Sequence, residues 1–252
     1  MSYAPELHAP AKTPFDDGTI PVLARWVGSW QISLRRRVLS QQELTRSYDR
    51  VAPGWSRTLE RLGVPGAYES MLRHALGEEM AVAGAAAPRR VLDCGIGTGA
   101  LSLALAGVAP APFALDAIDI SPRMLERAGG ALCDSSLAVS LRQADIRDLP
   151  YGDSLFDIAM TAHVLEHLVD PQVAIAEVLR VLKPGGLMIA CITRRSVLGF
   201  YVNLRWRTHR VTPDEAEAWL RDCGLENVRS LSFGKRGFCR RLSVALVARK
   251  PL

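Results

Sequence analysis

Short apolar segments alternate with segments of helical periodicity from residue 90 to the C-terminus, and this alternation limits the possible folds more than any other feature. The candidate strands are residues 91–94, 115–120, 137–141, 156–161, 187–192, 228–233 and 242–248. Several intervening segments have helical length, and residues 171–182 are the most regular of them. Strands alternating with helices predict an α/β fold with a doubly wound, mostly parallel seven-stranded sheet.

Capping signals mark the ends of several of these helices. Ser121 followed by Pro122 is typical of a helix start. Thr212, with Pro213 next and Glu215 three residues on, forms a capping-box pattern. The KPGG sequence at residues 183–186 predicts the end of helix 171–182.

The N-terminal third has a different pattern. Residues 1–20 are typical of a disordered or wrapping tail. Residues 21–87 have a helical pattern, since Val22, Trp26, Trp30 and Leu34 recur at helical spacing. We therefore divide the chain into an N-terminal tail and helical lid, residues 1–87, and an α/β domain, residues 88–252, with an insertion at residues 194–211.

The tryptophan-bearing segment, residues 20–39, has two interpretations. Its apolar stripe ends in Arg35-Arg36-Arg37, a combination typical of an interfacial helix that makes peripheral membrane contact. The preferred interpretation is a lid in which Trp26 and Trp30 pack over the α/β domain.

Glycines follow the first strand of that domain. Residues 91–99 read VLDCGIGTG, so Gly95, Gly97 and Gly99 lead from a strand into a helix, whose N-terminal amides can meet a ligand. The spacing differs from the GxGxxG of dinucleotide-binding dehydrogenases, which argues against a nicotinamide enzyme. Asp119 ends the next strand, where a carboxylate can accept hydrogen bonds from ribose hydroxyls.

Residues 90–193 resemble the S-adenosylmethionine (SAM)-dependent methyltransferases with a Rossmann-like fold, in their quinone, lipid and small-molecule branch. Five ordered motifs carry the resemblance: residues 93–99, 118–125, 143–146, 161–168 and 178–186. It implies SAM as cofactor and a terminal hairpin whose last strand is antiparallel. It also implies a set of cofactor-binding residues: Asp93, Gly95, Gly97, Gly99, Asp119, Ile120, Met124, Asp145, Ile146 and Thr161. Within that set, Asp119 would hold the ribose, and Asp145 would meet the adenine amino group.

The HVLEH sequence at residues 163–167 contains the candidate bases. His163 or His167 can accept a proton near neutral pH if the acceptor is a hydroxyl or a carbon acid. The alternative is that both histidines only shape the pocket. The same letters match a zinc-peptidase pattern, which its place after a strand disfavours. A divalent-metal-assisted O-methyltransferase, with His209 as an extra ligand, is a further alternative.

Two segments are expected to cover the pocket and select the acceptor. Tyr48, in the lid, can pack near the methionine end of SAM or simply pack between helices. The insertion at 194–211 interleaves aromatic residues with arginines, which suits a flat anionic acceptor or a lipid head group, or a loop gripping its own domain.

The expected activity is methyl transfer to a small-molecule acceptor that is aromatic, quinone-like or a lipid. A SAM-binding protein with drifted chemistry, regulatory or transferring another part of SAM, is the alternative. We expect no nucleic-acid partner, because no RNA-binding domain is apparent. Five single cysteines, no leader-like start and no membrane-length apolar stretch predict a cytoplasmic protein. The middle of the chain is acidic and both ends are basic.

Overall fold

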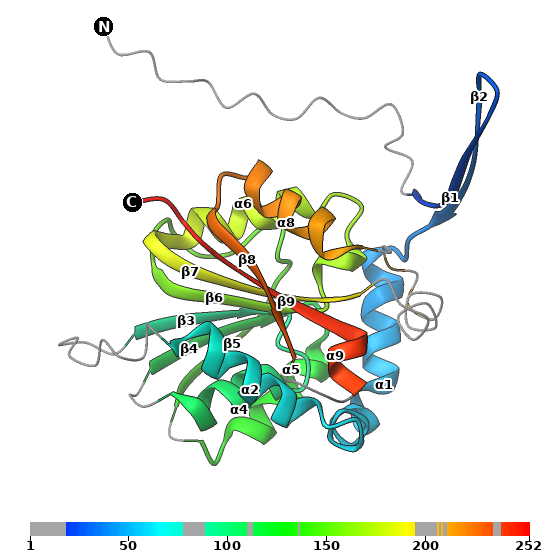
Figure 1. The fold of residues 1–252 in the computed structure, drawn as a ribbon. Helices are drawn as coiled ribbons and strands as arrows, with labels where there is room; N and C mark the ends of the chain where they lie inside the picture. Colours follow the sequence, from blue (N-terminus) through cyan, green and yellow to red (C-terminus); the bar gives the residue numbers. More distant parts are fainter. Residues whose placement is uncertain are drawn as a thin grey trace, which may run out of the picture.

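Seven strands pair into one sheet in the order β5-β4-β3-β6-β7-β9-β8 (Figure 1). Their bounds are β3 Arg89–Cys94, β4 Phe113–Asp119, β5 Ala138–Gln143, β6 Phe156–Ala162, β7 Leu182–Thr193, β8 Glu226–Ser232 and β9 Ser243–Arg249. The β3, β4, β5, β6 and β7 ladders are parallel, whereas β9 runs antiparallel to both β7 and β8. The predicted doubly wound sheet with an antiparallel last strand is confirmed.

The computed structural model describes residues 19–77, 89–109, 113–135, 137–194, 206, 208, 211–233 and 238–252. The first 18 residues of the tail predicted at 1–20, most of the insertion at 194–211, and His209 lie outside these residues, whereas Thr19 and Ile20 belong to strand β1. Within them, no helix has both the length and the apolar character that a membrane span requires.

Helices cover both faces of the sheet (Figure 1). One face carries α2 (Val64–Ala75), α4 (Ala100–Val108) and α5 (Pro122–Leu132), and the other carries α6 (Pro171–Val181) and α8 (Pro213–Asp222). Because side chains alternate along a strand, Val91 packs into the cluster beside α2 and α4. Its neighbour Leu92 packs into the cluster that contains Ile175 and Leu220. Two buried layers therefore sandwich the sheet.

The predicted caps are present. Ser121 accepts a hydrogen bond from the Met124 amide at the start of α5, and Thr212 and Glu215 form a reciprocal capping box on α8. Helix α6 ends at Val181, as the KPGG sequence predicted, and KPGG itself lies within β7, which begins at Leu182. The register of β7 against β6 shifts there, which accommodates the two glycines. Two short helices, η1 (Leu165–His167) and α9 (Phe238–Leu242), complete the described elements.

The N-terminal lid is helical only from residue 41 onward. Helix α1 spans Gln41–Arg61 and α2 follows, as the helical pattern predicted. The helix expected over residues 20–39 is wrong: β1 (Thr19–Val27) and β2 (Trp30–Arg37) form an antiparallel hairpin instead. Gly28, with φ +60°, and Ser29 make its two-residue turn, a glycine-led dipeptide that favours hairpins. Spacing by four residues cannot distinguish the two structures, since even spacing also repeats on one face of a strand.

Candidate functional site

A cavity of about 310 Å³ opens beyond the carboxyl ends of β3, β4 and β6. This is where parallel α/β sheets bind their ligands. The glycine-rich loop and the segment after β6 form its floor, and α1 with the residues just before it forms its roof. The roof residues include Val38, Leu39, Leu44, Tyr48 and Trp55, so that side of the cavity is largely apolar and aromatic.

The glycine loop leaves room for a ligand at one position. Gly95, Gly97 and Gly99 all have positive φ, at 83°, 55° and 86°. A Cβ on Gly95 would collide with the Val164 side chain, and one on Gly99 would touch α5. A Cβ on Gly97 would meet no atom within 4 Å and would take up open space in the cavity. The adjacent Thr98 hydroxyl is buried without a partner among the described residues. These features fit a cradle for a nucleoside cofactor.

Asp119 links the loop to the next strand. One of its carboxylate oxygens accepts a hydrogen bond from the Gly97 amide and the other from the Ser121 amide, both at 2.9 Å. Burial raises the pKa of Asp119, and these amide hydrogen bonds oppose that rise. Each carboxylate oxygen has lone pairs left for a ligand hydroxyl, and Asp119 lines the cavity.

Asp93 lies deeper, at the end of β3. It is buried, and the Ser102 hydroxyl donates to it at 2.6 Å. Burial is the main reason that its pKa rises to about 7, although the Ser102 hydrogen bond acts in the opposite direction. A carboxyl group that titrates near neutrality thus lies beneath the glycine loop.

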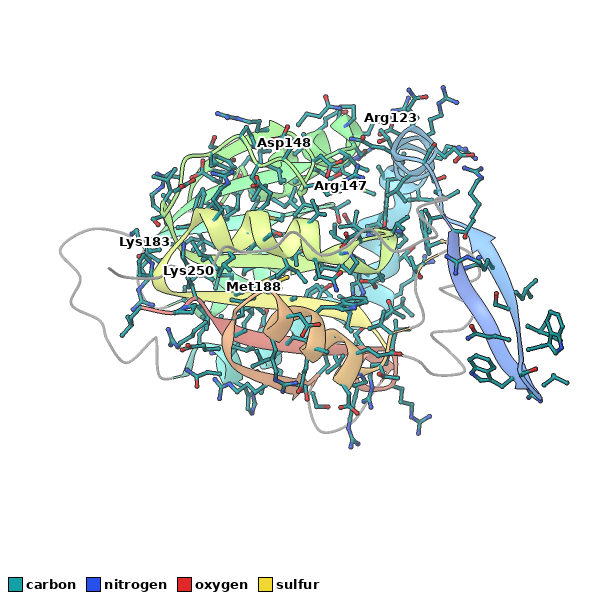
Figure 2. All side chains as sticks on the ribbon, turned by 90° about the horizontal axis from the view of Figure 1, so that it is seen from above. Arg123, Arg147, Asp148, Lys183, Met188 and Lys250 are labelled. Atoms are coloured by element: carbon teal, nitrogen blue, oxygen red, sulfur yellow. The ribbon has the colours of Figure 1, made fainter. Side chains whose placement is uncertain are left out.

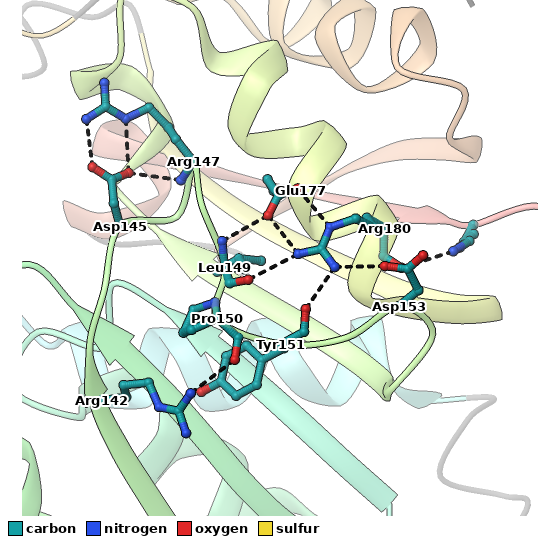
Figure 3. Close-up of polar contacts among 10 residues, drawn as sticks. Arg142, Asp145, Arg147, Leu149, Pro150, Tyr151, Asp153, Glu177 and Arg180 are labelled. Atoms are coloured by element: carbon teal, nitrogen blue, oxygen red, sulfur yellow. Dashed lines mark hydrogen bonds and ion pairs between the residues drawn. The ribbon is translucent and has the colours of Figure 1, made fainter.

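Asp145 is held by Arg147, which also lines the cavity (Figure 3). The guanidinium contacts both carboxylate oxygens, at 3.0 and 2.6 Å, and the Arg147 amide adds a third hydrogen bond. Partial burial opposes ionisation of Asp145, but Arg147 outweighs it and lowers the pKa. The carboxylate therefore stays ionised at the cavity wall.

His163 lines the cavity and pairs with Glu166, which lies behind the cavity wall. Nδ1 of His163 lies 3.2 Å from Glu166 and 3.1 Å from the Thr193 hydroxyl, and Nε2 lies 3.5 Å from Ser243. Glu166 is buried and accepts the Thr193 amide hydrogen. Burial disfavours its charge, yet His163, His167 and the Thr193 amide together lower its pKa to about 2. His163 has φ +59°, so this pairing holds a backbone conformation that is unusual for a non-glycine residue.

His167 joins an aromatic group at the roof. Its Nε2 lies 2.9 Å from the Tyr48 hydroxyl. Tyr48 stacks on Trp206, with ring centroids 4.7 Å apart, and meets Trp55 edge-on. Burial, then the charges of Glu166 and Asp119, raise the pKa of Tyr48, so its hydroxyl stays protonated and can donate to His167. Trp206 belongs to the predicted insertion and packs within this protein, against Tyr48 and Trp55 of α1 and against His167.

All the predicted site residues line the cavity except Gly99 and Thr161. Gly99 begins α4, and the Thr161 hydroxyl donates to the Cys94 carbonyl oxygen inside the sheet. The sequence did not predict Arg147 at the cavity or the pairing of Glu166 with His163. It also did not predict Asp49, which accepts a 2.6 Å hydrogen bond from the Ser121 hydroxyl. The one available signal was the Arg two residues after Asp145; nothing local marks Asp49.

The described residues include no group of three or more His, Cys, Asp or Glu side chains that is arranged to hold a metal ion. His163 pairs with Glu166 and His167 with Tyr48, so the HVLEH sequence does not converge on one point. The fourth ligand suggested from the sequence, His209, lies outside the described residues.

Known proteins match this chain in sequence and in fold. A family described as "Methyltransferase domain" matches residues 92–190. A demethylmenaquinone methyltransferase of Tropheryma whipplei is 30% identical over 220 residues, 76% of this chain and 88% of that protein. The ubiquinone/menaquinone biosynthesis C-methyltransferase UbiE of Syntrophotalea carbinolica is 34% identical over 148 residues, 59% of this chain and 60% of that protein.

Two solved structures share the fold. The [4+2]-cyclase SpnF superposes with a TM-score of 0.64 at 21% identity, covering 85% of this chain and 98% of that one. A SAM-dependent methyltransferase of Thermotoga maritima superposes with a TM-score of 0.58 at 20% identity, covering 82% and 99%. At these identities the likeness concerns the fold alone.

Proposed function

This chain belongs to the class I SAM-dependent methyltransferases, and we propose that its acceptor is a lipophilic small molecule with a phenolic or quinol-type ring. The observation that carries this proposal is the Tyr48–His167 pair, 2.9 Å apart in the apolar roof of the cavity. A ring hydroxyl needs a base before its oxygen, or the ring carbon beside it, becomes a good nucleophile. An aromatic, apolar roof suits a planar ring.

SAM, when bound, supplies an electrophilic methyl group. The residues proposed to hold it are Asp119 for the ribose, Asp145 and Ile146 for the adenine, and the backbone at Gly97. Met124 and Ile120 line the same wall and would exclude water from it. Asp93, below the loop, supports its conformation through Ser102.

His167 is the proposed base. As the acceptor hydroxyl approaches, its proton passes to the Tyr48 oxygen while the Tyr48 proton moves to Nε2 of His167. Tyr48 thus keeps its hydroxyl and His167 gains one charge, which the buried Glu166 carboxylate stabilises. His163 has a different proposed role: through Nδ1 it holds Glu166 in place.

The names of the sequence relatives support a quinone-like acceptor. The relatives from Tropheryma whipplei and Syntrophotalea carbinolica are described as methyltransferases of menaquinone or ubiquinone biosynthesis. We propose the same chemical class here and leave the ring substituents open. Metal-assisted O-methyl transfer is the second candidate; loss of turnover with a chelator, restored by a divalent ion, would favour it. A small-molecule methyl acceptor, the absence of a nucleic-acid partner and a cytoplasmic location are predictions that accompany the proposal.

The test is a SAM-turnover assay that detects S-adenosylhomocysteine, with a naphthoquinol, a simple phenol and a primary amine as acceptors. We expect turnover with the two hydroxylated rings and none with the amine. His167→Ala should lower turnover about 100-fold or more while SAM affinity stays nearly unchanged. Tyr48→Phe should lower it as well, because the relay loses its oxygen.

His74→Ala is the matched control, because His74 is exposed on α2, does not line the cavity and bonds only its own helix among the described contacts. It should leave turnover unchanged. Turnover of the amine alone, or full activity in His167→Ala, would show that no ring hydroxyl is deprotonated at this pair. Absence of S-adenosylhomocysteine with every acceptor would instead favour the alternative, a SAM-binding protein that is regulatory or transfers another part of SAM.

A further inference from the structure

The β1–β2 hairpin carries more exposed large apolar side chains than any other described element. Trp30 is 77% exposed and Trp26 69%, and Val27, Ile32 and Leu34 are also largely exposed. The other exposed large apolar side chains in the described part of the chain are dispersed over helices α4 and α6, loops and the C-terminus: Leu62, Leu103, Val169, Val173 and Leu252. Isolated exposed apolar residues are ordinary, whereas a contiguous group marks a contact surface.

The hairpin is not part of the main sheet. Among the described strands, β1 and β2 pair only with each other. Figure 1 shows them projecting from the body beside α1, and Figure 2 shows their side chains well clear of the sheet and its helices. The apolar side chains therefore face outward on an arm, and the lid in which Trp26 and Trp30 were expected to pack over the α/β domain is wrong.

Both faces of this arm carry apolar side chains near its tip. Val27 pairs with Trp30 and Arg25 with Ile32, so these residues share one face. Trp26 pairs with Gln31 on the opposite face. A folded protein partner would cover one face and leave the other in water. A lipid interface would cover both faces of an inserted tip at once, and tryptophan is enriched at that depth.

The positive charge of the arm indicates which kind of lipid surface it would bind. Residues 19–37 contain four arginines, at positions 25, 35, 36 and 37, and no acidic residue. Arg25 lies beside Ile32, two residues behind the tip, and the other three lie at the base. Arg37 pairs with Glu43 of α1, so Arg25 is the cation that lies nearest the tip. An arm with an apolar tip, a nearby arginine and no acidic residue complements anionic head groups.

We propose that the β1–β2 hairpin docks this protein, tip first, onto the surface of anionic bilayers. Trp26, Val27 and Trp30 enter the interfacial layer, which admits roughly 5–10 Å of an apolar surface. At about 3.3 Å per residue, Arg25 then lies at the level of the lipid head groups. Shallow insertion leaves the unpaired strand edges in contact with head groups and water, which satisfy their backbone groups.

Docking brings the cavity close to the bilayer. Strand β2 ends at Arg37, and the next two residues, Val38 and Leu39, line the roof of the cavity. The protein is thereby held beside the bilayer from which a lipophilic acceptor is delivered, with the roof about one length of β2, roughly 26 Å, from the inserted tip. This delivery step rests on the proposed function, whereas the docking itself does not.

The experiment sediments the full chain with vesicles of phosphatidylcholine containing about 30% phosphatidylglycerol, and with phosphatidylcholine alone. The full chain should bind the anionic vesicles at least about 10-fold better, and roughly 0.5 M salt should abolish the difference by screening the arginines. The double variant Trp26→Ser/Trp30→Ser should lose binding about 10-fold, and Arg25→Gln should weaken it. Val173→Ser, which changes an exposed apolar residue on α6, is the matched control and should bind like the parent chain.

Protein that stays in the supernatant at low salt, or a double variant that binds undiminished, would overturn the docking. Equal binding to both kinds of vesicle would overturn the anionic preference. A dimer in vesicle-free solution that the double variant abolishes, without vesicle binding, would assign the arm to a second copy of this chain. SAM affinity measured without vesicles should be the same in all variants, which confirms that they fold.

A turnover assay with two quinols distinguishes failure of the docking from failure of the proposed function. The double variant should methylate a water-soluble naphthoquinol as fast as the parent chain. It should lose about 10-fold with a polyprenylated quinol dissolved in anionic vesicles. Vesicle binding without turnover of either quinol would refute the proposed acceptor and leave the docking intact.

Discussion

Gly97 combines a backbone conformation that favours glycine with a position that faces open space in the cavity. Its φ of +55° lies in the left-handed region, and the direction in which a Cβ would point is open cavity. At Gly95, by contrast, a Cβ would meet Val164, so that glycine serves close packing. The glycines of one loop therefore have different functions: one leaves room for the cofactor and another allows the loop to approach η1.

Gly97→Ala should weaken SAM binding by about 10-fold or more, because the added methyl group projects into the cradle. The left-handed backbone should also cost about 1 kcal/mol of stability. Calorimetric titration with SAM measures the first effect and thermal unfolding the second. Gly224→Ala is the control: Gly224 has φ +89° with nothing near its Cβ and lies away from the cavity. Equal SAM affinity in both variants would mean that Gly97 does not face the cofactor.

The site residues that could be predicted from the sequence are those fixed by a strand end. Asp119 ends a parallel strand, and Gly95, Gly97 and His163 come just after one, so identifying the strand also places the residue at the cavity. Asp49 was not predictable, because its contact with Ser121 joins positions 72 residues apart. Nothing in the local pattern of α1 specifies which residue faces α5.

At the scale of elements, the Arg180 guanidinium on α6 is hydrogen-bonded to the loop after β5 (Figure 3). Arg180 donates two 2.8 Å hydrogen bonds to Glu177, and it also contacts the Tyr151 carbonyl oxygen and the Asp153 carboxylate. Glu177 in turn accepts the Leu149 amide hydrogen. The loop that carries Asp145 and Arg147 to the cavity is thus held at its far end by a helix.

Arg180→Lys should lower the free energy of unfolding by about 1–3 kcal/mol, because a lysine cannot reproduce the planar fork that serves several acceptors. SAM affinity should fall as well, since the loop that carries Asp145 loosens. Denaturant unfolding and SAM titration are the two measurements. Arg221→Lys provides the comparison: Arg221 pairs with Glu217 along α8, and the variant should change stability by less than about 0.5 kcal/mol. Similar losses in both variants would contradict the special role of the fork.

The elements themselves were predictable where helix and strand periodicities differ, and not where they coincide. Helix α8 has a capping box and regular spacing, so the prediction there was correct. Residues 20–39 carry apolar residues at even spacing, which fits a strand as well as a helix, and the deciding signal was the Gly28-Ser29 dipeptide between them. The hairpin also makes no pairing with the main sheet, so the alternation of the α/β domain gave no guidance there.

For the whole molecule, two buried carboxyl groups make stability depend on pH in opposite directions. Glu166 has a pKa lowered to about 2, so its contribution is present above the ordinary glutamate pKa and is lost as the pH falls toward 2. Asp93 has a pKa raised to about 7. In the unfolded chain it titrates near 3.9, so between these values the folded state binds the proton more tightly. Its contribution is therefore complete below about pH 4 and is lost as the pH rises through 7.

Asp93→Asn should remove this second dependence, because the amide does not titrate and can still accept the Ser102 hydrogen bond. The free energy of unfolding of the parent chain should decline relative to the variant between pH 4 and 7, by up to about 4 kcal/mol. Urea unfolding at intervals of pH, without SAM, measures the difference. Ser102→Ala sharpens the test: it removes a hydrogen bond that favours the Asp93 carboxylate, so its decline should extend to higher pH than in the parent chain. Parallel curves for the parent chain and Asp93→Asn would mean that Asp93 is ionised throughout, and that a positive charge or solvent reaches the base of the glycine loop.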